Sequence, residues 1–158
     1  MDLLNELHIL LNVLIASILS GIIGLEREFY AKPAGTKTNM IVGGSVALLV
    51  SLGKLITVYF NKANLGNDMV EVDPTRVIQA IIVGISFIGA GTVLQIKSEQ
   101  KIKYLTTASV ILFSTGVSIA VALHHYVLAV GCTLLILSIH LLIRKLNFWL
   151  RKNKFSDE

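Results

Sequence analysis

The sequence predicts an all-α membrane protein, a polytopic bundle of about five transmembrane helices. Three observations support this fold class. Of 158 residues, 54% are hydrophobic and only 15% are charged, whereas about a quarter of the residues of a typical soluble domain are charged. The mean hydropathy is +0.73. The apolar residues are gathered into separated runs, and each run is long enough to cross the ~30 Å hydrocarbon core of a bilayer as a helix.

The first predicted span covers residues 7–25. Ala16, Ser20 and Gly24 follow one another at intervals of four, so they lie on one face of the helix. Small residues let a second backbone approach closely within a membrane, so we expect this face to pack against a neighbouring helix. Acidic residues precede the run and no basic segment does, which favours a retained helix over a signal peptide.

A polar segment separates the first span from the second. It begins at Glu26 and contains Pro33 and Gly35, which break helical structure. The second predicted span covers residues 40–60. Lys54 lies near its far end, where the ammonium group has to reach the membrane surface or find a partner.

The third predicted span opens with the best helix-start signal in the chain. Asp73 can accept hydrogen bonds from free N–H groups, and Pro74 suits the first helical position. Residues 77–96 carry no charge. Three helix-packing glycines interrupt this apolar run, Gly84, Gly89 and Gly91. Because glycine is unfavourable within a helix unless it permits close packing, we expect this helix to lie at the centre of the bundle.

Two further spans are predicted after a short basic segment. Thr106 or Thr107 is expected to cap a fourth helix that runs to about residue 123. Adjacent histidines leave room only for a tight turn before a fifth span over residues 126–143.

The predicted domain organisation is a transmembrane domain over residues 1–145 followed by a basic juxtamembrane cytoplasmic tail over residues 146–158. The tail mixes basic and aromatic residues, which is typical of a segment lying on an anionic lipid leaflet.

The distribution of Lys and Arg predicts the orientation. One side of the predicted bundle carries most of them, namely Arg27, Lys32, Lys37, Lys97, Lys101, Lys103, Arg144, Lys145, Arg151, Lys152 and Lys154. The other side has Lys62, with Lys54 and Arg76 at its edge. The positive-inside rule therefore places the N-terminus outside and the C-terminus in the cytoplasm. Membrane topology also explains the net charge of +4, so we expect the lipid bilayer, and no nucleic acid, as a partner.

This topology gathers two polar clusters. The inner one contains Glu26, Arg27, Lys37, Thr38, Thr106 and Thr107, and the outer one contains Asp73 and Arg76. A carboxylate, a guanidinium, hydroxyls and a helix N-terminus are the groups that bind a small anion or cation. The alternative interpretation is that these residues are charges and caps at the membrane edge.

Magnesium is the metal to consider, since it prefers oxygen ligands and usually one or two carboxylates. The candidate ligands are Glu26 and Asp73, which are the acids next to a span. No acid lies in the middle of a predicted span. Conduction of Mg²⁺ would therefore require a homo-oligomer whose subunits each contribute an acid, or a pathway of hydroxyls and backbone carbonyls.

Other reactive residues carry no recognisable chemistry. His124 and His125 are adjacent and point in different directions on a helix, so a structural role is favoured over a metal pair. Cys132 is the one cysteine, which excludes an intrachain disulfide. No nucleophile with a paired base and no phosphate-binding glycine loop occurs, so we expect neither an enzyme nor a cofactor other than Mg²⁺.

Five motifs follow one another along the chain. They are Gly-Leu-Glu-Arg-Glu at 24–28, Ala-Gly-Thr-Lys-Thr-Asn at 34–39, Asp-Pro-Thr-Arg at 73–76, Gly-Ile-Ser-Phe-Ile-Gly-Ala-Gly at 84–91 and Leu-Thr-Thr-Ala at 105–108. In order and spacing the chain resembles the MgtC/SapB family of bacterial inner-membrane proteins. The resemblance implies a multi-pass protein linked to magnesium limitation, and some members are reported to act on the proton-translocating ATP synthase.

The chain departs from the family pattern at four positions. Lys37 stands where arginine is common and Asn39 where histidine is common, while Ser86 and Tyr104 each replace a glycine. The sequence also stops soon after the fifth run, so we expect a SapB-like short form without a soluble C-terminal domain.

Two functions remain open at this stage. The first is a protein of Mg²⁺ homeostasis that acts as a transport component. The alternative is a non-transporting regulator that binds another membrane complex, such as the proton-translocating ATP synthase.

Overall fold

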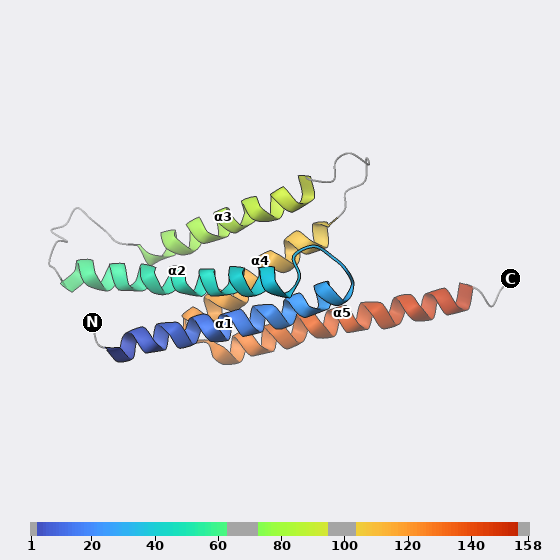
Figure 1. Ribbon diagram of the computed structural model, residues 1–158, viewed down its shortest axis with the longest axis horizontal. Helices are drawn as coiled ribbons and strands as arrows, with labels where there is room; N and C mark the ends of the chain where they lie inside the picture. The colour runs from blue at the N-terminus through green and yellow to red at the C-terminus, as the bar shows by residue number, and fades with distance from the viewer. Residues whose placement is uncertain (1–2, 63–72, 95–103, 155–158) are drawn as a thin grey trace.

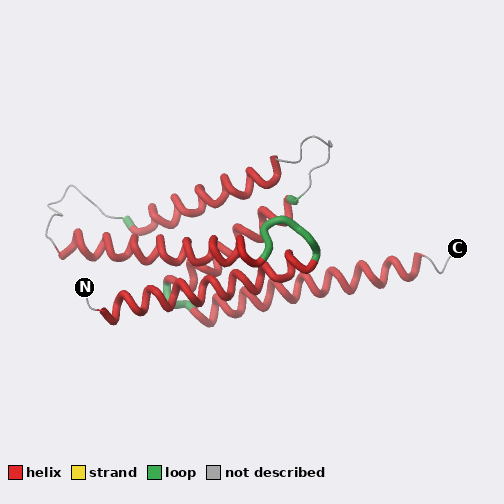
Figure 2. The backbone as a smooth tube through the Cα atoms, viewed as in Figure 1, coloured by secondary structure: helices red, strands yellow, loops and turns green. Residues whose placement is uncertain are grey.

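The computed structural model is a bundle of five helices that run alternately up and down (Figure 1). It describes residues 3–62, 73–94 and 104–154. The helices are α1 (Leu3–Phe29), α2 (Thr36–Lys62), α3 (Pro74–Leu94), α4 (Leu105–Ala122) and α5 (Tyr126–Lys154). All five are long and apolar enough to cross a membrane, and the described residues contain no strand (Figure 2). The predicted fold class is confirmed.

The small-residue face of α1 packs against α2, as predicted. Ala16, Ser20 and Gly24 are all buried. A Cβ atom added at Gly24 would lie 2.8 Å from both the carbonyl oxygen of Gly35 and the Cα atom of Thr36. Only glycine allows the two backbones to approach this closely.

The central helix is α4, so the prediction that the helix of residues 77–96 lies at the centre is wrong. Of the most apolar stretch of α4, 56% is buried, against 11% for α3. Ser114 and Ser118 lie on α4. Lipid tails offer their hydroxyl groups no hydrogen-bond partner. The hydroxyl of Ser114 donates to Asn39 on α2 and that of Ser118 contacts Ser20 on α1, so these hydrogen bonds hold α4 against both helices.

The three glycines of α3 differ in their surroundings. Gly89 is buried, and a Cβ atom added there would lie 3.3 Å from the Cβ of Ala108 on α4. At Gly84 and Gly91, no atom of the described residues lies within 4 Å of such a Cβ. Of these three glycines, only Gly89 therefore packs against another helix of the described chain.

The start of α3 agrees with the sequence. The backbone N–H and the hydroxyl of Thr75 both donate to Asp73 Oδ1, over 2.8 Å and 2.6 Å respectively. These hydrogen bonds hold the pKa of Asp73 below its ordinary value because they stabilise the ionised carboxylate. Asp73 is therefore the N-cap of α3.

The start of α4 does not agree, because neither Thr106 nor Thr107 caps it. The N-cap is Tyr104, which has φ 67° and makes no side-chain hydrogen bond to the helix end. The N–H of Thr107 instead donates to the carbonyl of Tyr104 over 2.9 Å, so the helix begins earlier than predicted. A left-handed backbone suits glycine better than tyrosine, by about 1–2 kcal/mol.

The remaining boundaries are the end of α5 and the two segments that flank α3. The last helix, α5, continues to Lys154 without a break, so the predicted division between residues 145 and 146 does not coincide with a helix end. The connecting segments at residues 63–72 and 95–103, where two predicted loops fall, lie outside the described residues.

Candidate functional site

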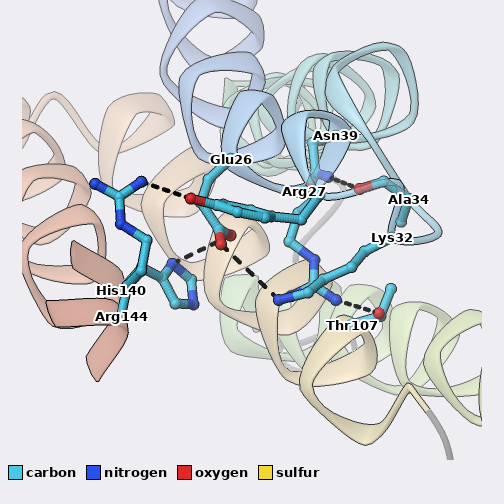
Figure 3. A network of polar contacts seen from close by, with 9 residues as sticks. Glu26, Arg27, Lys32, Ala34, Asn39, Thr107, His140 and Arg144 are labelled. Carbon is cyan, nitrogen blue, oxygen red and sulfur yellow. Dashed lines mark hydrogen bonds and ion pairs between the residues drawn. The ribbon is translucent and has the colours of Figure 1, made fainter. Parts of the chain in front are cut away.

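Arg27 is the most unusual buried residue of the bundle. Its side chain is 1% exposed, although it carries a permanent charge. The Nη2 group donates to the hydroxyl of Thr107, which joins the end of α1 to the first turn of α4 (Figure 3). The Nε and Nη1 atoms are buried without a hydrogen-bond acceptor in the described part of the chain. A buried and incompletely paired guanidinium is costly, and such groups in membrane proteins mark functional sites.

Glu26 lies beside Arg27 and turns toward α5. Its Oε2 atom is 3.5 Å from His140 Nδ1, and its Oε1 atom is 4.0 Å from Lys32 Nζ. The Glu26 and His140 side chains are only 16% and 14% exposed. Negative charge is unfavourable at the C-terminal end of a helix. The neighbouring cations Arg27 and Lys32 offset that cost, and so would a protonated His140.

A second contact ties α5 to the same end of the bundle. Arg144 lies one turn after His140 on α5, and its Nη1 group donates to the hydroxyl of Tyr30 (Figure 3). Residues of α5 therefore hold both the carboxylate of Glu26 and the loop that follows α1.

The loop between α1 and α2 is held by hydrogen bonds from both helices. Glu28 Oε2 accepts from the backbone N–H of Thr36 at the start of α2, over 3.0 Å. From the other side, Asn39 Nδ2 donates to the carbonyls of Ala34, over 2.6 Å, and Gly35, over 3.0 Å. Ala34 has φ 56°, a conformation that needs such support in a residue other than glycine.

Asn39 also connects this loop to the centre of the bundle. Its side chain is fully buried, and its Oδ1 atom accepts from the hydroxyl of Ser114 on α4, over 3.1 Å. Ser118 donates to the Ser114 carbonyl over 2.9 Å, and its hydroxyl is 3.1 Å from that of Ser20 on α1. A buried line of amide and hydroxyl groups thus leads from the loop into the middle of α1 and α4.

This line has a definite electrostatic character. Among the described residues, Arg27 is the one charged side chain in the buried core. Amide and hydroxyl groups carry no net charge, so the charge in the buried core is that of Arg27, beside which lies the partly buried carboxylate of Glu26.

Three of the predicted inner-cluster residues come together in the structure, namely Glu26, Arg27 and Thr107. The others, Lys37, Thr38 and Thr106, are exposed at the same end of the bundle and take no part in the network.

The predicted outer pair lies far from this cluster. Asp73 and Arg76 sit at the start of α3, at the opposite end of the helices (Figure 1). The two metal-ligand candidates, Glu26 and Asp73, therefore cannot share one ion. The described residues contain no group of three His, Cys, Asp or Glu side chains that could hold a metal.

Sequence reasoning missed several members of the network. They are His140, Tyr30, Lys32 and Arg144, of which the sequence pattern placed Lys32 and Arg144 only among the basic residues of one side. The one available signal was the spacing of His140 and Arg144, which places both on the same face of a helix. Nothing in the sequence indicated that this face meets Glu26.

Five membrane-length helices around a buried polar core, with a charged cluster at one end, define a polytopic membrane protein. The sequence model of the MgtC family matches residues 13–149. The chain therefore belongs to the MgtC family.

Several curated relatives are similar to the chain. SapB of Bacillus subtilis is 36% identical over 129 residues, which is 82% of this chain and 53% of that protein. MgtC of Salmonella typhimurium is 29% identical over 136 residues, covering 86% and 52%. A putative magnesium transporter of Escherichia coli, YhiD, is 29% identical over 146 residues, covering 92% and 65%. The chain thus spans between half and two thirds of these relatives. No solved structure matches it.

Proposed function

We propose that this protein serves magnesium homeostasis in the bacterial inner membrane, and that a single copy does so without conducting Mg²⁺. Family membership and the similarity to a relative described as a putative magnesium transporter support the first part. The second part depends on one observation, the buried guanidinium of Arg27. A fixed cation in a low-dielectric interior raises the energy of a divalent cation that passes near it.

On this proposal the inner cluster is a recognition site rather than part of a pore. The cluster is reached from outside through Lys32 and Glu26, whose side chains are 43% and 16% exposed, and polar groups of a membrane partner would contact it there. The proton-translocating ATP synthase, to which the family resemblance pointed, is one such complex. The protein then acts as a regulator that senses or transmits magnesium limitation.

A transport component is the second candidate, and one observation favours it. The face of α3 that carries Gly84 and Gly91 is open among the described residues, so a second copy could approach it closely. An oligomer formed in this way would line a common axis with residues from several copies, which one chain cannot.

The magnesium link is tested in a deletion strain grown at limiting and at ample Mg²⁺. We expect a growth defect only at limiting Mg²⁺, restored by the parent chain and by the control Lys37→Gln, which changes an exposed lysine outside the network. Equal growth of the deletion and parent strains at limiting Mg²⁺ would refute a role in magnesium homeostasis.

The mode of action is tested separately with purified protein in proteoliposomes loaded with a Mg²⁺ indicator. We expect uptake equal to that of protein-free liposomes. Uptake above that background, lost in Glu26→Gln, would instead establish the transport component and exclude the regulator.

A further inference from the structure

A second polar site lies at the end of the bundle opposite Arg27. It is a pocket of about 490 Å³ among the beginning of α1, the far end of α2 and the turn between α4 and α5. Six of its polar lining residues matter here: Asn5, His8, Asn12, Lys54, His124 and Tyr126. The charge pattern predicts that this end faces outward. No function assigned above uses the pocket.

The charge of the pocket comes from Lys54. None of the described residues that line it is acidic, and the one hydrogen bond of the Lys54 ammonium within the described chain goes to the carbonyl of Ala122, over 2.7 Å. An ammonium group has three N–H donors. That bond caps the end of α4 and leaves donors and most of the positive charge available to the pocket.

Helix dipoles do not cancel this charge. Of the helices next to the pocket, α1 and α5 begin there and α2 and α4 end there. Their partial charges of about +0.5 and −0.5 are therefore equal in number and opposite in sign. The net field of the pocket is that of the lysine, which favours an anion and disfavours Mg²⁺.

A chain of hydrogen bonds fixes the amide of Asn12. The hydroxyl of Tyr126 donates to Asn12 Oδ1 over 2.8 Å, and it lies 3.0 Å from His124 Nδ1. Because that hydroxyl proton is already donated, His124 Nδ1 must be the donor in the second contact. Asn12, which is 3% exposed, then has its carbonyl oxygen satisfied and its amide nitrogen left to donate to a ligand.

We propose that this pocket binds a phosphate group. Lys54 of α2 supplies the charge, and the amide nitrogen of Asn12 on α1 supplies an oriented neutral donor. A tetrahedral oxyanion offers acceptors in several directions and so meets donors from several helices better than a planar carboxylate does. The phosphate is either free or carried by a lipid headgroup, since the pocket lies at the predicted membrane surface.

The proposal is tested on the full chain, purified in detergent, by equilibrium dialysis with radioactive inorganic phosphate at constant ionic strength. Lys54→Gln is expected to weaken binding at least about tenfold, which corresponds to one lost charge-assisted hydrogen bond. Lys37→Gln is the matched control, because it removes a lysine from the same helix at its other end. Its affinity should equal that of the parent.

A second arm distinguishes the source of the phosphate. Native mass spectrometry of the delipidated protein counts bound phosphatidylglycerol, with diacylglycerol as the comparison that lacks phosphate. Binding of phosphatidylglycerol that depends on Lys54, without binding of free phosphate, assigns the site to a lipid headgroup. Dependence on Lys54 in the dialysis assay assigns it to a free phosphate.

The proposal is overturned if neither ligand binds, or if Lys54→Gln and Lys37→Gln bind both ligands equally. If Lys54→Gln does not reach the membrane, Tyr126→Phe provides the test, because it removes only the hydroxyl that orients the amide of Asn12. A several-fold loss of binding is then expected, and unchanged binding would overturn the proposal. None of these outcomes depends on growth at limiting Mg²⁺, so they are independent of the proposed function.

Discussion

The guanidinium of Arg27 at the end of α1 donates a hydrogen bond to the hydroxyl of Thr107, 80 positions further along the chain. Both side chains are almost completely buried. This contact fixes the end of α1 against the beginning of α4, and it leaves the rest of the guanidinium buried without described acceptors. Substitutions at Arg27 distinguish a structural role of this arrangement from a functional one.

Arg27→Met should fold but lose function. The substitution removes an incompletely paired buried charge but also takes a hydrogen bond from Thr107 and a neighbouring cation from Glu26, so we expect these effects to offset each other and membrane abundance to stay close to that of the parent. Growth of the complemented deletion strain at limiting Mg²⁺ should nevertheless fail. Full complementation by Arg27→Met would show that the guanidinium has no functional role.

Arg27→Lys should also fail to complement. Lysine keeps the charge but has neither the planar fork of donors nor the same reach to Thr107. Growth at limiting Mg²⁺, normalised to membrane abundance on immunoblots, is the measurement. If Lys complements while Met does not, positive charge alone is sufficient and the geometry of the guanidinium is unimportant.

Glu26→Gln should abolish complementation without loss of abundance, since glutamine keeps the shape of glutamate and removes its charge. His140→Phe should weaken function in the same direction, because Glu26 Oε2 lies 3.5 Å from His140 Nδ1. Growth at limiting Mg²⁺, normalised to membrane abundance, is the measurement for both variants. Parental growth of His140→Phe would show that its contact with Glu26 is not required.

Gly89→Leu and Gly91→Leu should behave differently although they are two positions apart. The first forces a side chain against Ala108 and should destabilise the protein by the ~1–3 kcal/mol typical of overpacking. The second enters space that is open among the described residues. Thermal unfolding in detergent should separate the two variants. Equal destabilisation would indicate that another chain covers Gly91.

Asn39→Ala should lower stability by leaving buried groups without partners. The amide holds two loop carbonyls and the hydroxyl of Ser114, and each buried polar group left unsatisfied costs about 1–3 kcal/mol. Thermal unfolding of the purified protein measures the loss. Lys37→Ala, an exposed change two positions earlier, is the control and should leave the unfolding temperature unchanged.

The five membrane-spanning helices were largely predictable from the sequence. Whether an apolar run crosses a bilayer depends on its own length and hydropathy, which is why the spans were found from the sequence alone. The cap at Asp73 and the small-residue face of Ala16, Ser20 and Gly24 are also local patterns. Each depends on residues within one or two turns of each other.

The arrangement of the helices, by contrast, was decided by tertiary structure. Lipid is as apolar as a leucine side chain, so hydrophobicity does not rank one membrane helix as more central than another. Packing and hydrogen bonding between helices make that choice, and they placed the hydroxyl-bearing α4 at the centre and left α3 at the edge. Tertiary contacts also explain why Arg27 is buried and Lys37 is exposed. Both are basic residues near the same end of the bundle, but only Arg27 meets a hydroxyl from a distant helix and is buried there.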